Sequence, residues 1–161
     1  MSIVVSDTSP IRALAHLGYL DLLQKLFGEV LVPPAVASEL QQPRSKFPPI
    51  LLHDTAFVRI EAPRNRFSVE ELRRTLGLGE AEALVLALEV HADAILIDES
   101  AGRAAARQRG LLPLGVLGIL LRAKQKTLVG PLRPLLDRLQ GELGFFISSS
   151  VRSEVLKSAG E

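Results

Sequence analysis

Short apolar runs alternate along the chain with longer stretches of helical periodicity, and this alternation excludes most fold classes. The runs are only three to five residues long, whereas the segments between them place apolar residues three and four positions apart. Strands that alternate with helices are typical of a parallel sheet covered by helices on both faces. The runs at 3–5, 30–32, 57–60, 94–97 and 112–116 predict an α/β fold with a mostly parallel sheet of four to five strands.

Cap and break signals place the helices between these runs. Ser9 before Pro10 has the pattern of a helix start, and Ser100 occupies a similar position after the fourth run. Ser68 and the acid three residues later have capping-box spacing, while the glycines at 77–79 and at 141–144 indicate helix breaks. We expect helices from 9, 34, 68, 80, 100 and beyond 116, with a polar loop at 41–49.

The composition restricts the available chemistry. A chain of 161 residues with 47% hydrophobic residues suits one domain over 1–161, with the helical segment from about 130 packed on it. The absence of cysteine excludes thiol nucleophiles, disulfides and thiolate metal sites. His16, His53 and His91 have no mutual spacing typical of a metal site. The net charge of +1 predicts no global field, so binding of a charged partner must be local.

The mean hydropathy of +0.25 raises the question of a membrane segment. A spanning helix needs roughly 20 apolar residues, whereas the run 111–121 contains Pro113 and is followed by Arg122. The chain begins without a basic region and soon reaches Asp7, unlike a signal peptide. We therefore expect a cytoplasmic protein without membrane contact. Its apolar residues belong to a core or to a subunit interface. The run 111–121 is either core, which is the favoured interpretation, or part of a homodimer face.

Two of the apolar runs end in aspartate, at Asp7 and Asp98. If their strands are parallel neighbours, both carboxylates lie at one sheet edge, where open α/β sheets bind ligands. Aspartate also caps helices well, and this alternative stays open. Ser9 and Ser100, two residues further on, would leave the carboxylates free for another role. Two buried like charges need a proton or a cation, so the pattern favours a divalent cation at this edge.

Further acids lie on helices that can lean over the same edge. Glu39 is on the helix after the second strand, where a polar side chain ordinarily faces solvent. Glu80 and Glu82 are two residues apart and point to different faces of their helix, so at most one should enter the site. Periodicity does not choose between the two glutamates.

The segments that contain these acids follow one another along the chain in the order typical of a PIN-domain ribonuclease. The chain resembles most closely the prokaryotic PIN-like family of unknown function that is associated with toxins of toxin–antitoxin pairs. The resemblance extends over nearly the whole chain, including 102–105, 114–123 and 145–156. The segments that carry it are Asp7-Thr8-Ser9, Glu39 within 36–40, Glu80 and Glu82 within 79–83, and Asp98 within 96–99.

The resemblance implies a three-layer α/β/α sandwich whose acids hold Mg²⁺ or Mn²⁺ for hydrolysis of RNA phosphodiester bonds. It also implies a small antitoxin protein as a partner. Many PIN domains carry aspartate where this chain has the pair Glu80 and Glu82, and the role of Glu99 stays open. The residues carried over are the metal ligands Asp7, Glu39, Glu82 and Asp98, with Glu80 as the other candidate helix acid, and Thr8 and Ser9 as hydrogen-bonding residues toward the site and its substrate.

Arginines near the acids are candidates for phosphate contacts. Arg103 and Arg107 are four residues apart on the helix after Asp98 and share a face, although a solvated surface explains them equally well. With six Phe, one Tyr and no Trp, we expect little base stacking on aromatic side chains. A second basic cluster, either solvated surface or an RNA contact, comprises Arg64, Arg66, Arg73 and Arg74.

Two other functions fit the same residues. A PIN-like module with altered metal geometry would bind nucleic acid or regulate without cleaving. A receiver-like phosphoryl-transfer domain would use Asp7 and Asp98, but it should also have a lysine near a strand end, and no lysine closes these strands. The ribonuclease is therefore the favoured interpretation.

Overall fold

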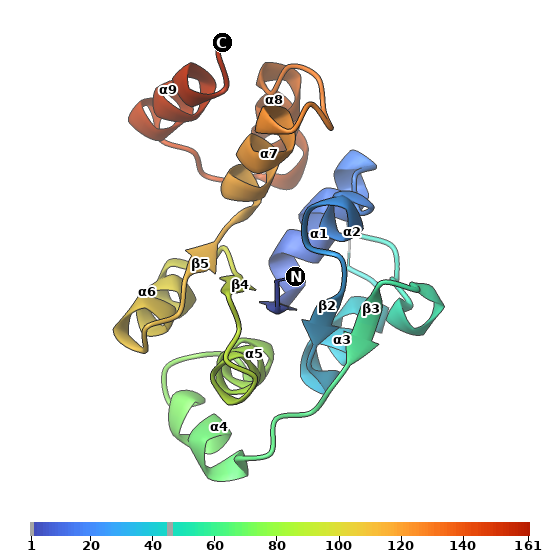
Figure 1. The fold of residues 1–161 in the computed structure, drawn as a ribbon, viewed down its shortest axis with the longest axis vertical. Coiled ribbons are helices and arrows are strands. Elements are labelled where there is room, and N and C mark those ends of the chain that lie inside the picture. The colour runs from blue at the N-terminus through green and yellow to red at the C-terminus, as the bar shows by residue number, and fades with distance from the viewer. Residues whose placement is uncertain (1, 45–46) are drawn as a thin grey trace.

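The computed structural model describes residues 2–44 and 47–161 and has a parallel sheet at its centre (Figure 1). Within these residues the sheet has five strands in the order β3-β2-β1-β4-β5, and every neighbouring pair is parallel. The predicted α/β class is therefore confirmed. The strands are β1 (Val4–Ser6), β2 (Val30–Val32), β3 (Val58–Ile60), β4 (Ala94–Leu96) and β5 (Pro113–Leu114).

The strand order reverses between β1 and β4, in the middle of the sheet. From β1 the chain continues outward through β2 and β3, and it then returns to the other side of β1 with β4 and β5. Val5 pairs with Ile95 in register, and the Asp7 amide donates to the Leu96 carbonyl at 2.9 Å. The carboxyl ends of β1 and β4 therefore form the switch-point crevice at which open α/β sheets bind ligands.

Successive residues of the strands face two separate apolar layers, because side chains alternate along a strand. Val4 and Leu96 face a layer that includes residues of α1 (Thr8–Leu17), α2 (Leu22–Phe27) and α3 (Pro34–Gln41). Val5 and Ile95 face the opposite layer. The predicted three-layer fold is confirmed. The helices of the second layer are α4 (Arg66–Leu72), α5 (Leu78–Glu89) and α6 (Ser100–Gln108).

The C-terminal helices belong to the first layer. They are α7 (Val116–Gln125), α8 (Arg133–Leu143) and α9 (Ser149–Ser158). Leu136 and Leu139 of α8 are fully buried in the same apolar cluster as α1. The run 111–121 divides between β5 and the start of α7, and its Ile119 and Leu120 are core residues. Among residues 2–44 and 47–161, no helix combines the length and apolar character that a bilayer span requires.

Two predicted serine caps are wrong, because the cap position of each helix lies before the serine. Asp7 occupies the N-cap position of α1, so Ser9 lies in the first turn and Pro10 is the third helical residue. Proline is tolerated there because the first amides of a helix have no acceptor within it. In α6 the cap position is Glu99, and Ser100 is the first helical residue.

Other predicted ends move because a neighbouring side chain caps the helix or because the helix continues through glycine. The Asn65 side chain accepts from the Ser68 amide at 3.1 Å, so α4 begins before the predicted capping box. Gly79 lies inside α5, and α8 runs through Gly141 to a left-handed Gly144. An internal glycine costs a helix only about 1 kcal/mol, which packing can offset. Residues 45–46 of the predicted loop 41–49 lie outside the described residues.

Candidate active site

A cavity of about 270 Å³ opens at the switch point and is lined by acids from several elements. We call it the acid cavity. Asp7 follows β1, Glu39 lies on α3, Glu80 is in the first turn of α5, and Glu99 precedes α6. The strand order brings these residues together although they are far apart in the sequence.

Asp7 is buried at the acid cavity, with 4% of its surface exposed. Burial raises the pKa of its carboxyl to about 7, the Thr8 amide opposes this rise, and the negative charges of Glu80, Glu39 and Asp98 add to it. Within the described residues its side chain makes no capping hydrogen bond to α1, although it occupies the cap position. The carboxylate is therefore poorly compensated by the protein around it.

Asp98 is half-buried and holds the start of another helix. Its Oδ1 accepts from the Val116 amide, the first of α7, at 2.9 Å, while its Oδ2 is buried without a partner among the described residues. Burial raises the pKa of Asp98 to about 6, although the Val116 amide and the positive charge of Arg103 lower it. One oxygen is thus fixed and the other is available.

Glu39 is positioned by two residues of α1. The Thr8 hydroxyl donates to its Oε2 at 2.8 Å, and the buried Arg12 donates to its backbone carbonyl. The Arg12 guanidinium also lies 5.3 Å from the centre of the Phe47 ring. Burial and the nearby Arg44 lower the pKa of Arg12. Arg12 therefore fixes the end of α3, from which Glu39 reaches the acid cavity.

Glu80 and Glu82 have different environments, and this answers the question that periodicity leaves open. Glu80 lines the acid cavity; its Oε1 accepts from the Gly77 amide at 3.2 Å, and its Oε2 is buried without a partner in the described part of the chain. Burial raises the pKa of Glu80, against the effect of the Gly77 amide. Glu82 does not line the acid cavity. Its oxygens accept hydrogen bonds from the Ala35 amide and from Arg66. The structure thus places Glu80, rather than the predicted ligand Glu82, among the other acids.

Three of the carboxylates lie directly against glycine backbones. A Cβ atom on Gly79 would be 2.8 Å from Glu39 Oε1, and one on Gly102 would be 2.8 Å from Glu80 Oε2. A Cβ on Gly115 would lie at the same distance from Asp98 Oδ1. Any larger side chain at these positions would displace a carboxylate, so the glycines leave the space that the acids occupy.

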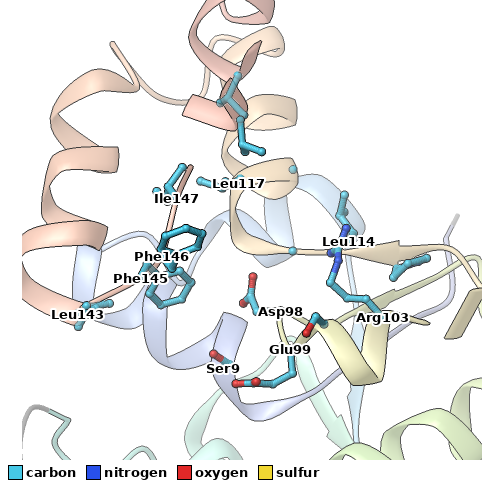
Figure 2. A pocket seen from close by; sticks show the side chains of 17 residues that line it. Ser9, Asp98, Glu99, Arg103, Leu114, Leu117, Leu143, Phe145, Phe146 and Ile147 are labelled. Carbon is cyan, nitrogen blue, oxygen red and sulfur yellow. The ribbon is translucent and has the colours of Figure 1, made fainter. Parts of the chain in front are cut away.

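A second hollow of about 700 Å³ adjoins the acid cavity, and we call it the apolar groove (Figure 2). Asp98 and Arg103 line one part of it, and the aromatic pair Phe145 and Phe146 lies on the opposite side of Asp98 in this view. Phe146 is 91% exposed, an aromatic surface that composition gave no reason to expect. The residues that line both hollows are Ser9, Glu99 and Phe145.

The predicted arginine contacts separate into different environments. Arg103 lines the apolar groove and donates to the Ile97 carbonyl at 3.1 Å, whereas Arg107 is exposed and lines neither hollow. Of the second basic cluster, Arg66 pairs with Glu82, while Arg73 and Arg74 pair with glutamates of their own segment. These ion pairs favour a structural or solvated role for that cluster.

The acids around the switch point explain the match found by comparison with known families. The family model DUF3368, a PIN domain, covers residues 3–161. The chain belongs to this family of PIN domains. PIN domains are generally nucleases and typically use divalent metal ions. No curated protein matches the chain.

The donor set of this PIN domain fits a hard divalent cation. Mg²⁺ prefers oxygen ligands and usually combines one or two carboxylates with water and substrate phosphate. Glu80 Oε2 and Asp98 Oδ2 are buried oxygens without a partner among the described residues, and both carboxylates are close enough to Asp7 for their charges to raise its pKa. With the side chains in these positions, residues 2–44 and 47–161 contain no group of three His, Asp or Glu side chains that could hold a metal ion.

Proposed function

We propose that this PIN domain is a Mg²⁺- or Mn²⁺-dependent endoribonuclease that hydrolyses RNA phosphodiester bonds. The observation that carries the proposal is the pair of unpartnered buried oxygens, on Glu80 and Asp98, together with the buried Asp7 carboxyl, whose pKa burial raises and the negative charges of these two residues raise further. Buried carboxylates are costly unless a cation or a proton neutralises them. A site of this kind supports metal-dependent hydrolysis better than a structural role.

Each acid has a defined part in the proposal. Asp7, Glu39, Glu80 and Asp98 hold the cation, and Glu82 is not among the ligands. When bound, the ion supplies Lewis acidity toward the phosphate and an acidified water. Thr8 keeps the Glu39 carboxylate in place through its 2.8 Å hydrogen bond, and this lowers the cost of ordering that side chain on binding.

The substrate strand is held by residues at the junction of the two hollows. Arg103 projects into the apolar groove close to Asp98, where it can bind a phosphate next to the scissile bond. Ser9 lines both hollows and can donate a hydrogen bond to the backbone of the strand. Arg107, exposed on the same helix, is a peripheral contact at most.

The decisive experiment replaces the acids by isosteric amides. Asp98→Asn and Asp7→Asn should abolish cleavage of single-stranded RNA in Mg²⁺ or Mn²⁺, while circular dichroism and thermal unfolding show an intact fold. Asp21→Asn is the matched control, because Asp21 is an exposed aspartate that pairs with Lys25. Undiminished cleavage by both variants would refute the assignment of Asp7 and Asp98 to the active site.

A second candidate function is a nucleic-acid-binding or regulatory module without cleavage. It is favoured by one observation: among the described residues no three His, Asp or Glu side chains form a group that could hold a metal ion. A protein of this kind would bind RNA or single-stranded DNA but would leave both intact in every divalent cation tested. Binding and cleavage assays on the same oligonucleotides separate the two functions.

The biological setting is also part of the proposal. We infer a toxin that acts on cytoplasmic RNA, is neutralised by a small antitoxin protein and assembles as a homodimer. Expression of the chain should arrest growth, and Asp98→Asn should relieve the arrest. Sedimentation equilibrium of the purified protein tests the dimer.

A further inference from the structure

We propose that the apolar groove is a base-binding subsite, in which one base of a single-stranded nucleic acid stacks on Phe146. The inference rests on the proposed function, because the strand that brings its base here also brings its phosphate to the acids. It adds a binding site and a substrate feature, an unpaired base, to the cleavage chemistry.

The groove and the acid cavity adjoin each other. Ser9, Glu99 and Phe145 line both, and Asp98 lies on the groove side of this junction. A phosphate held near Asp98 therefore has the groove directly beside it. Figure 2 shows Asp98 between Arg103 on one side and the Phe145–Phe146 pair on the other. A nucleotide can be bound through its phosphate and through its base. Arg103 offers a partner for the phosphate, and the Phe145–Phe146 pair offers one for the base.

The walls of the groove match the chemistry of a nucleobase. A base has apolar faces and polar edges, and aromatic rings stack on those faces whatever the sequence. Leu117 and Ile147 contribute apolar surface, whereas Ser100 and Arg103 present hydroxyl and guanidinium groups. The volume of about 700 Å³ lies within the range of small-ligand sites, roughly 300–1,000 Å³.

Phe146 is exposed on a segment that is anchored on both sides. It follows the left-handed Gly144 that ends α8. The Phe145 amide donates to the Leu139 carbonyl at 3.0 Å, and the Gln140 side chain donates to the Ile147 carbonyl at 3.3 Å. Ile147 is 7% exposed, whereas Phe146 is 91% exposed. The backbone under the exposed ring is thus fixed, which lowers the entropic cost of stacking.

The experiment measures binding of a short fluorescent oligoribonucleotide by anisotropy, with Ca²⁺ replacing Mg²⁺ to slow cleavage. Wild type and Phe146→Ala are each tested on the intact oligonucleotide and on an abasic backbone of equal length. Base–aromatic stacking is worth about 1–3 kcal/mol per base, so Phe146→Ala should lose about 5- to 150-fold in affinity for the intact strand. On the abasic strand the same substitution should change the affinity less than twofold.

Two further variants test the nature of the contact. Phe146→Trp should retain or improve the affinity, because tryptophan also stacks. Phe67→Ala is the control: Phe67 is 75% exposed on α4 and lines neither hollow, so its loss should leave binding unchanged. Because Phe146 and Phe67 are both exposed, we expect these variants to fold, and thermal unfolding checks this.

The outcomes separate this inference from the proposed function. Equal affinity of wild type and Phe146→Ala, or an equal loss on intact and abasic strands, overturns the subsite even where wild type cleaves RNA. A change in sedimentation with unchanged RNA affinity also overturns it, and it assigns the groove to a protein partner or a second copy of the chain. If wild type neither binds nor cleaves nucleic acid, both proposals fall. Binding without cleavage refutes only the proposed nuclease activity. The affinities of wild type and Phe146→Ala for intact and abasic strands then decide whether the groove binds a base.

Discussion

Two glutamates on α5, only two residues apart, differ in how many of their carboxylate oxygens have hydrogen-bond partners. Glu82 is buried with both oxygens paired, to the Ala35 amide at 2.9 Å and to Arg66 at 2.7 Å. Glu80 has one oxygen on the Gly77 amide and the other buried without a partner in the described residues. The first arrangement connects α3, α4 and α5, whereas the second leaves binding capacity at the acid cavity.

This difference teaches how to distinguish a structural acid from a functional one. Burial does not separate the two, because a buried carboxylate can be stabilised by local donors or left for a ligand. The number of satisfied oxygens does distinguish Glu80 from Glu82, and leaving a buried group unsatisfied costs about 1–3 kcal/mol. Glu80 and Asp98 each keep an unsatisfied oxygen and are the candidates for a functional role, whereas both oxygens of Glu82 are held by other elements.

The largest expected effect is on catalysis at Glu80. Glu80→Gln keeps the shape of the side chain but removes a ligand charge, so we expect RNA cleavage to fall by about 100-fold, or about 2.7 kcal/mol in the barrier. Stability should be unchanged or slightly higher, because a buried uncompensated charge is removed. Cleavage rates at saturating Mg²⁺ measure the effect, with the exposed Glu71→Gln as control. Full cleavage activity of Glu80→Gln would show that the charge of Glu80 is not needed for cleavage, and Glu80 would then not differ from Glu82 in function.

The next effect is on stability at Glu82. Glu82→Ala removes the acceptor of the Ala35 amide and leaves Arg66 without its partner, so the free energy of unfolding should fall by about 2 kcal/mol. Urea denaturation monitored by circular dichroism measures this. At a temperature where the variant is folded, its cleavage rate should remain within a few-fold of wild type. A loss of activity with unchanged stability would contradict the structural role.

Stability should also depend on pH through Asp7 and Asp98. Their pKa values in the folded protein are about 7 and about 6, against a usual value of 3.8, so between pH 4 and 7 the folded state binds more protons than the unfolded chain. Stability without divalent cations therefore decreases as the pH rises through this range, and remains low above it. We expect a decrease of at least about 1.4 kcal/mol, the equivalent of one pKa unit.

Urea denaturation in EDTA at pH 5 and pH 8 tests this dependence. Asp7→Asn should reduce the difference between the two pH values, and Mg²⁺ should reduce it in wild type by stabilising the charged carboxylates. The same pH slope in wild type and Asp7→Asn would show that Asp7 is already compensated, as Glu82 is.

The smallest effect concerns the glycines that leave space for the acids. A methyl group at Gly115 would lie 2.8 Å from Asp98 Oδ1 and 3.1 Å from Arg103 Nη1, so Gly115→Ala should shift the carboxylate and lower cleavage by about tenfold, or about 1.4 kcal/mol. Gly141→Ala is the control, because a Cβ there meets no atom within 4 Å and should stabilise α8 by about 0.5–1 kcal/mol. Equal activity of the two variants would mean that Asp98 tolerates displacement.

Much of the fold was predictable because hydrophobic periodicity is a local property of the chain. The apolar runs correspond to all the described strands, and the two aspartates that end them lie at neighbouring strand ends as expected. Helix starts were less predictable, because the true cap of α4 is Asn65 and the helix α1 begins directly after its strand. Those choices depend on which neighbouring group completes the hydrogen bonds of the first turn.

The sequence alone determined the α/β class, the order of strands and helices, the family resemblance and the acids available for a metal site. Only the tertiary structure chose Glu80 over Glu82, since that choice depends on Ala35 and Arg66, which come from other elements. The tertiary structure also exposed Phe146 beside the acids and paired most of the second basic cluster. The physical reason is that periodicity records which side chains are buried, whereas the partners of a buried charge are set by contacts between segments distant in sequence.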